Sequence, residues 1–293
     1  MSRILHTFIV IASVFLAVSD ARLAAQEAAA APPADTGPDE FQVAAAQPDG
    51  SQAGSSRRRR GRATTYKVIE VKDGGVVTGT VQYMGVVPKP RKIHVVKDHE
   101  TCKQHPVEVP LMRVDAEHRV GEAVVYLADI SAGKDWPKSD AKSTIDQKTC
   151  EFHPHVQVVR AKSPVEIVNS DPVAHNINAS QRIFTLFNIL QPQQGMKATQ
   201  QFERPGLVNL KCNVHDWMQA YVHVAVHPYI VVTGDDGSFR LEGVPPGKYQ
   251  LGVWQEYLGE QIFDVEVKPG ETTQMDVVLK PKAGEEGTAE KTR

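Results

Sequence analysis

Short apolar segments separated by turn residues constrain the fold of this chain more than any other feature. From Tyr66 onward, runs such as Lys67–Val71, Gly75–Tyr83, Ile93–Lys97 and Val165–Val168 are rich in valine and isoleucine, and turn residues (glycine, proline, asparagine or aspartate) separate these runs. Segments of this kind are typical of β-strands, and no long stretch repeats apolar residues at the 3.6-residue period of a helix. The pattern predicts an all-β fold of the Greek-key sandwich or barrel kind.

The N-terminal residues predict export. Arg3 and His6 precede an apolar run from Phe8 to Val18, and alanines follow at positions 21, 24 and 25. The run is too short to cross a bilayer as a helix. We therefore expect a secretory signal peptide at residues 1–25, with an uncleaved anchor as the alternative. A periplasmic or secreted protein with no membrane span after signal removal follows from this interpretation.

Composition separates low-complexity regions from the predicted domains. Residues 26–65, rich in alanine, proline and arginine, predict a disordered linker, and residues 282–293 predict a disordered tail. The 33 basic and 35 acidic side chains give a net charge of −2. This balance argues against a nucleic-acid or membrane-surface binder.

A cysteine, a histidine and a methionine at short spacing form the clearest metal-binding pattern. The segment Lys211–Met218 contains C-x2-H-x2-M, and His175 stands upstream on a separate predicted loop. One thiolate, two imidazoles and a thioether are the groups that an electron-transfer copper site uses, and the methionine argues against zinc, the main competitor. The sequence therefore predicts one copper ion bound by His175, Cys212, His215 and Met218.

The three cysteines fit this interpretation. In an exported chain an odd number leaves one cysteine without a disulfide partner, and copper binding accounts for Cys212. We expect a disulfide between Cys102 and Cys150. The alternative is a second metal site of Cys102, His105, Cys150 and His153, because each cysteine stands three residues before a histidine. We expect ordinary structural roles for His153, His155, His223 and His227.

Several segments occur in the order that cupredoxins use. They are Phe152–Val158, Val165–Asp171 with His175 and Asn176, and Phe202-x-x-Pro205-Gly206 before the C-x2-H-x2-M pattern. Residues 144–227 therefore resemble a small cupredoxin, with a ligand loop most similar to that of amicyanin. The resemblance implies a β-sandwich with a type 1 (blue) copper site, in which Asn176 ties the two ligand loops together. His215 is expected to be the ligand nearest the surface, and Trp217 is expected to shield the rim of the site.

A second module surrounds the first. Residues 233–239 and 243–249 resemble the second half of a carboxypeptidase-regulatory-like (transthyretin-like) β-sandwich, whose opening strand has its counterpart at residues 77–83. We therefore expect residues 66–143 and 228–281 to form one split sandwich, with the cupredoxin inserted in it or adjoining it. Three independent pieces in series are the alternative. Proteins of this layout resemble those labelled methylamine-utilisation-like, and no substrate follows from that label.

Three functions are compatible with these features. The first is one-electron transfer through the copper site to an unidentified redox partner protein. The alternatives are periplasmic copper trafficking or storage, and an extracellular binding module with a structural copper. The sequence contains no G-x-S-x-G, H-E-x-x-H or P-loop motif, so we do not expect an enzyme.

Overall fold

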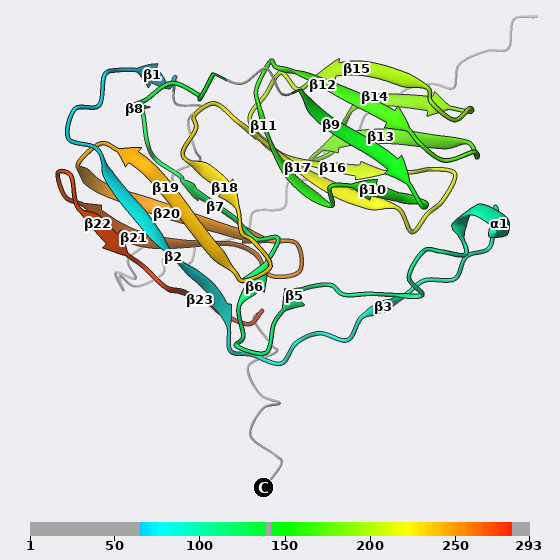
Figure 1. Cartoon of the computed structure of the whole chain (residues 1–293), viewed down its shortest axis with the longest axis horizontal. Helices are drawn as coiled ribbons and strands as arrows, with labels where there is room; N and C mark the ends of the chain where they lie inside the picture. The colour runs from blue at the N-terminus through cyan, green and yellow to red at the C-terminus, as the bar shows by residue number, and fades with distance from the viewer. Residues whose placement is uncertain (1–64, 139–141, 283–293) are drawn as a thin grey trace, which may run out of the picture. The chain divides into compact units, whose positions relative to one another are not determined.

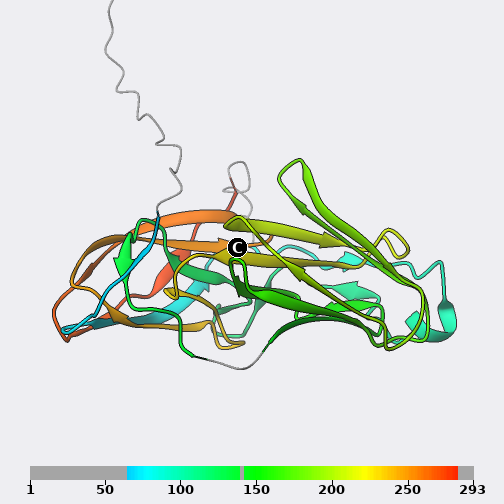
Figure 2. The same cartoon turned by 90° about the horizontal axis from the view of Figure 1, so that it is seen from above.

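The computed structural model describes residues 65–138 and 142–282. The predicted signal peptide lies outside these residues, as do the predicted linker and tail apart from Thr65 and Lys282. Strands form nearly all the regular structure of the described chain, and α1 (His99–Cys102) is a single helical turn (Figures 1 and 2). The all-β fold class predicted from the sequence is therefore confirmed.

Two sheets formed by residues 143–225 enclose one core. Their strand orders are β10-β9-β12-β15 and β11-β17-β16-β13-β14. The strands are β9 (Ser143–Lys148), β10 (Glu151–His153), β11 (Val156–Arg160), β12 (Pro164–Asn169), β13 (His175–Gln181), β14 (Phe184–Gln191), β15 (Lys197–Gln201), β16 (Gly206–Lys211) and β17 (Gln219–Ala225). The pairs β9–β12 and β11–β17 are parallel, whereas the other pairs are antiparallel. This mixture requires connections that cross between sheets, as in a Greek-key sandwich.

Alternating side chains build this first core. Along β12 and β16, buried residues alternate with more exposed ones, because successive side chains of a strand point to opposite faces of its sheet. Ile145, Ile167, Ile177 and Val208 are fully buried in it, and Cys212 and Met218 belong to the same cluster. Two of the predicted metal ligands, Cys212 and Met218, are therefore part of the core of this sandwich.

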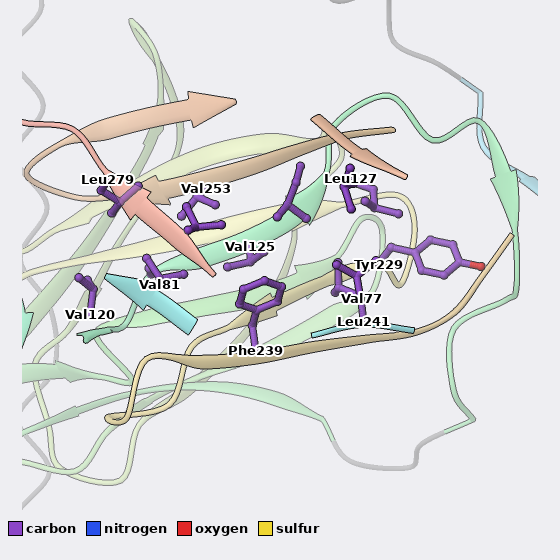
Figure 3. Close-up of a cluster of buried hydrophobic side chains, with 14 of the residues drawn as sticks. Val77, Val81, Val120, Val125, Leu127, Tyr229, Phe239, Leu241, Val253 and Leu279 are labelled. Carbon is purple, nitrogen blue, oxygen red and sulfur yellow. The ribbon is translucent and has the colours of Figure 1, made fainter. Parts of the chain in front are cut away.

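Two further sheets enclose a second core. Their orders are β18-β7-β20-β21 and β19-β2-β22, with β23 also pairing with β2. The strands are β2 (Gly75–Tyr83), β7 (Val124–Leu127), β18 (Ile230–Val232), β19 (Ser238–Val244), β20 (Gly247–Gln255), β21 (Gly259–Val267), β22 (Thr272–Gln274) and β23 (Val277–Leu279). Figure 3 shows its side chains, among them Val77, Leu127, Phe239 and Val253. Strands that precede the first sandwich in sequence thus pair with strands that follow it.

The segment of residues 91–109, called the strap below, leaves the second sandwich and packs on the first. It contains β3 (Arg91–Lys92), α1 and β4 (Glu108–Val109), and β3 pairs with β4. Figure 1 shows it as an extended stretch of chain that carries α1. Ile93 and Cys102 are buried in the first core, and the Cys102–Cys150 disulfide joins the strap to the sandwich. The predicted disulfide is present, so the alternative metal site that required free Cys102 and Cys150 is not formed.

The strap also differs from the sequence prediction. A strand was expected at residues 93–97, but only Arg91 and Lys92 pair as β3. The chain leaves the two-stranded ladder after Ile93, because Ile93 turns into the first core while His94, Val96 and Lys97 are exposed. The remaining short strands are β1 (Lys67–Val68) with β8 (Ala132–Gly133), and β5 (Arg113–Val114) with β6 (Val120–Gly121).

A third, smaller cluster joins residues of both sandwiches. Val124, Val156 and Trp254 are its buried members, and the His223 ring lies 4.6 Å from the Trp254 ring. His155 Nε2 lies 2.8 Å from Glu256 Oε2. Burial alone would lower the pKa of His155, but the Glu256 carboxylate outweighs this effect and raises it. Both apolar packing and an ion pair therefore connect the two sandwiches.

Candidate metal centre

The sheet that contains β13, β16 and β17 brings the predicted ligands together. Lys211 of β16 pairs with Gln219 of β17, so the loop between them begins at Cys212 and ends at Met218. Two backbone hydrogen bonds hold this loop tight: Cys212 N donates to Met218 O at 3.2 Å, and Met218 N donates to His215 O at 3.1 Å. β13 pairs with β16 on its other side. His175, at the start of β13, thereby lies next to the loop.

Three donor atoms converge in a buried space. The Nδ1 atoms of His175 and His215 are 3.0 Å apart, and Cys212 Sγ lies 4.0 Å from His215 Nδ1. One donor atom from each of these three residues lies within 4.8 Å of the other two. Both histidines are fully buried, Cys212 is 3% exposed and Met218 is 1% exposed. The structure thus brings His175, Cys212 and His215 together and buries Met218 on the same loop.

A carboxylate contacts the Nε2 atom of each imidazole. His175 Nε2 lies 2.7 Å from Asp171 Oδ2, and His215 Nε2 lies 2.9 Å from Asp98 Oδ2. A neutral imidazole that donates its Nε2 hydrogen to a carboxylate carries a lone pair on Nδ1. Two such lone pairs at 3.0 Å repel each other unless a proton or a metal ion lies between them. Together with a neighbouring thiol, this donor set fits a soft or borderline transition metal such as copper.

Asp171 is fixed by its own backbone contacts. Its two carboxylate oxygens accept hydrogen bonds from the N–H groups of Thr149 at 2.7 Å and Cys150 at 2.8 Å. Burial works to raise the pKa of Asp171, but the hydrogen bonds from His175 and these two N–H groups lower it below its ordinary value. The carboxylate therefore stays charged opposite His175. Such partners orient the imidazole of a metal site and raise its basicity.

Sequence reasoning missed both carboxylates. Asp171 stands four residues before His175 in the Asn169–Asp171 turn, so its proximity could have signalled a partner. Asp98 is 117 residues from His215 and gives no local signal. It lies at the start of α1, with a left-handed backbone at φ 51°, a conformation that aspartate tolerates better than most residues. The strap thus contributes a polar group to the centre.

Hydrogen bonds around Cys212 favour its thiolate. The backbone N–H groups of Asn176 and His215 each donate to Cys212 Sγ at 3.4 Å. Burial works to raise the pKa of Cys212, but the two histidines and these N–H groups outweigh it and lower the pKa to about 6. Burial likewise works to lower the pKa of His175, but Asp171 and Cys212 raise it to about 8. An anionic sulfur beside two imidazoles is ready to bind a cation.

Asn176 links β13 to the loop that contains Cys212. Its Oδ1 accepts a 2.7 Å hydrogen bond from the N–H of Asn213, and its Nδ2 donates to Asn188 Oδ1 on β14. The side chain is 5% exposed. These contacts hold the His175 strand and the Cys212 loop in register from one side of the site.

The expectation that His215 lies nearest the surface is wrong in this structure. His215 is fully buried, because Asp98 of the strap covers its Nε2 and the Trp217 ring packs against it at a centroid distance of 5.0 Å. Trp217 Nε1 donates to Cys150 O at 3.2 Å. A cavity of about 300 Å³ instead borders Trp217 and Met218, and Arg91, His105 and His155 also line it.

The other histidines lie apart from the three donor atoms. His105 Nε2 lies 3.4 Å from Glu151 Oε1, and His153 is exposed with Nε2 3.1 Å from Lys148 O. His223 and His227 are held neutral, since burial lowers the pKa of each to about 4. His155 pairs with Glu256, as described above. Among the described residues, the clusters of possible metal ligands include none of these five histidines.

Three solved copper proteins resemble part of the chain. The copper-containing nitrite reductase of Thermus scotoductus SA-01 is 19% identical with a TM-score of 0.26, over 30% of this chain and 23% of the reductase. A Cu(I) amicyanin variant is 16% identical with a TM-score of 0.27, over 30% of this chain and 86% of that chain. A purple cupredoxin from Nitrosopumilus maritimus is 19% identical with a TM-score of 0.25, over 29% of this chain and 100% of that chain.

At these scores the matches do not decide the fold, which is defined instead by the strand orders given above. No protein-family model matches the sequence, and no curated protein matches it. Within the described part of the chain, no helix has the length and apolar character needed to cross a membrane.

Proposed function

We propose that His175, Cys212, His215 and Met218 bind one copper ion and that the protein carries single electrons. The observation that supports this most is the convergence of three buried donor atoms within 4.8 Å of one another. Copper, when bound, supplies a one-electron Cu(I)/Cu(II) couple. The thioether of Met218 is a weak donor that copper tolerates and that zinc seldom uses.

The protein's own groups prepare the site. Asp171 and Asp98 hold the two imidazoles so that Nδ1 of each faces the thiol. The N–H groups of Asn176 and His215 stabilise negative charge on Cys212 Sγ. The strap and Trp217 exclude water from His215. Groups fixed before binding need little rearrangement when the charge at the site changes, which favours rapid electron transfer.

The burial of the donors favours electron transfer over copper trafficking or storage. A site that loads and releases metal needs an open ligand, and both histidines here are fully buried. With His215 covered, Trp217 and Met218, which line a cavity of about 300 Å³, offer a route between the centre and solvent. An unidentified redox partner protein would exchange electrons along it, and no catalysed reaction is proposed.

The domain layout and location are part of the same proposal. Residues 144–227 would form a cupredoxin domain, and residues 66–143 with 228–281 a carboxypeptidase-regulatory-like sandwich. Pairing of β7 with β18 and β20, and of β2 with β19, supports the split arrangement. The strap crosses from the second module to the first. Export to the periplasm or beyond is consistent with the disulfide, since such bonds persist in oxidising compartments.

Copper loading and spectroscopy test the proposal. The full chain without residues 1–25 would be loaded with Cu(II) and its visible spectrum and redox cycling recorded, with Cys212→Ser and the exposed-site control Thr144→Ser alongside. We expect one copper per chain and an intense thiolate-to-copper absorption band that Cys212→Ser alone abolishes. A colourless protein that binds Cu(I) and releases it readily would favour trafficking. Absence of stoichiometric copper binding would refute both functions.

A further inference from the structure

The Cys102–Cys150 disulfide lies directly against the candidate metal centre. A donor nitrogen of His215 and the sulfurs of Cys102 and Cys150 all lie within 4.8 Å of one another. Cys150 Sγ is also within 4.8 Å of donor atoms of Asp171 and His175. Both cysteines are fully buried.

The oxidised sulfurs are poor metal ligands, whereas the reduced ones are strong. Thiolates bind soft cations such as Cu(I), and two thiolates with one imidazole form a complete three-coordinate donor set. We propose that reduction of the Cys102–Cys150 disulfide creates a second soft-metal site, made of Cys102, Cys150 and His215. The inference goes beyond the proposed function and does not depend on Cys212.

The chemistry balances with an external dithiol as reductant. The dithiol breaks the Cys102–Cys150 bond by thiol–disulfide exchange, gives up two electrons and two protons, and becomes a disulfide itself. Cys102 and Cys150 leave this step as thiols. Binding of a metal ion then displaces their two protons.

A reductant would reach the buried bond through local opening of the strap. Its backbone hydrogen bonds join residues of the strap to one another, such as Ile93 N to Val107 O at 2.8 Å and Cys102 N to Asp98 O at 2.9 Å. Val96 is 74% exposed and Val107 is 69% exposed. Side chains make the other contacts of the strap with the sandwich: Asp98 with His215, Arg91 with Trp217 O and Gln219, His105 with Glu151, and buried Ile93. A segment without backbone pairing to the sandwich opens locally at a lower free-energy cost than the paired strands of the core.

The two sites share His215, which makes them competitors. Coordination of His215 by the reduced cysteines would withdraw an imidazole from His175 and Cys212. A reducing partner would therefore weaken the first site while it creates the second. In an oxidising compartment only the first site is available.

A variant that lacks the first thiolate isolates the second site. Cys212→Ser protein is reduced with a phosphine under anaerobic conditions, separated from the reductant and titrated with Cd(II), a soft ion without redox chemistry of its own. We expect one Cd(II) per chain with ultraviolet thiolate-to-metal absorption, and no such absorption in unreduced Cys212→Ser protein. Adding His215→Ala should weaken Cd(II) binding at least about tenfold, whereas adding His99→Ala, on the exposed face of the strap, should leave it unchanged.

Three results would overturn the inference. Equal Cd(II) binding before and after reduction would show that the cysteines are not a site. An affinity that is insensitive to His215→Ala would show that the thiols bind metal without the imidazole, as they would in an unfolded chain. Weakening by His105→Ala in place of His215→Ala would assign the site to the sequence neighbour of Cys102. Loss of copper binding by the unreduced wild-type chain would contradict the proposed function and leave this test intact.

Discussion

The Nε2 atom of His215 lies 2.9 Å from the Oδ2 atom of Asp98, although 117 residues separate them in sequence. Because this contact orients the imidazole, loss of the contact should weaken the proposed copper site even though Asp98 is not one of its proposed ligands. We expect Asp98→Ala to lower copper affinity by about 10- to 100-fold, measured by competition with a chelator. Asp98→Asn, which keeps an acceptor oxygen, should recover most of the affinity, and its visible band should stay close to that of the wild type. Equal affinity in all three proteins would contradict the orienting role.

Replacing Asn176 with alanine should lower the stability of the protein more than replacing Asn178 does. Asn176→Ala removes the acceptor of the Asn213 N–H, which is only partly buried, and the net loss of one hydrogen bond costs about 0.5–1.5 kcal/mol. Urea denaturation of the metal-free protein should show a free energy of unfolding lower by this amount. Asn178→Ala, two residues along β13, is the matched control and should have a smaller effect. The idea fails if Asn178→Ala costs as much as Asn176→Ala.

Met218→Leu should change the reduction potential of the proposed copper centre more than it changes the affinity of the protein for copper. Leucine fills the buried volume but donates no electrons, so Cu(II) loses more stabilisation than Cu(I), and the reduction potential should rise. Voltammetry of the loaded protein measures this shift. Met112→Leu, in the core of the other sandwich, controls for a general effect of replacing a buried methionine. An unchanged potential in Met218→Leu would mean that Met218 does not act on the metal.

The disulfide should stabilise the metal-free protein. Cys102 and Cys150 are 48 residues apart, and a loop of that length corresponds to about 4 kcal/mol in the chain-entropy treatment of cross-links. We expect Cys102→Ala with Cys150→Ala, in a Cys212→Ser background that prevents disulfide exchange, to lower the free energy of unfolding by roughly 2–4 kcal/mol. A reductant should have little effect on that variant and a large effect on its parent. Equal sensitivity of the two proteins to reductant would rule out this account.

Because His223 is buried, the protein should lose stability in acid. Burial lowers the pKa of His223 to about 4, against about 6.5 in an unfolded chain. As the pH falls from 6.5 to 4, the unfolded state binds the proton first, so the free energy of unfolding decreases. The full effect is about 3 kcal/mol at 1.36 kcal/mol per pKa unit. His227 acts in the same direction, since burial lowers its pKa to about 4 as well.

A comparison of variants separates the contribution of His223 to the acid-induced loss of stability from the contribution of titrating carboxylates. His223→Phe, which keeps an aromatic ring against Trp254, should lose less stability than the wild type between pH 7 and pH 4.5 in urea denaturation. His118→Phe, at an exposed turn, should follow the wild type. Parallel pH profiles for wild type and His223→Phe would exclude His223 as the cause.

The sequence was sufficient for the fold class because strand alternation is a local property. Val77, Val81 and Ile167 lie in runs predicted to be strands, and they are buried at alternate positions of the strands that form there. β13 and β14 escaped prediction: β13 reads His-Asn-Ile-Asn-Ala-Ser-Gln, and its strand conformation depends on pairing with β14 and β16. β14 leaves Phe184, Leu186 and Leu190 exposed and buries Gln191, so its apolar residues do not mark one buried face.

Part of the candidate site could also be predicted from the sequence, and part could not. The proximity of Cys212, His215 and Met218 could be predicted from their spacing, because a loop between two paired strands must bring its ends together. The role of Asp98 and the burial of His215 could not be predicted. Both depend on where the strap packs, and that is decided by Ile93 in a core built from distant strands and by a disulfide to Cys150. Long-range packing of an irregular segment leaves no periodic trace in a sequence.

Because of the strap, the first sandwich cannot be used as a self-contained fragment that carries the whole site. A fragment cut at the strand boundaries, from Ser143 to Ala225, would contain all four proposed ligands and still be incomplete. It would have an uncovered His215, a Cys150 thiol without its partner and no counterpart of Asp98. Transplanting the centre into another scaffold therefore requires residues 91–109 as well. Gene fusions or truncations that separate the two parts should change the metal affinity and the stability of the product.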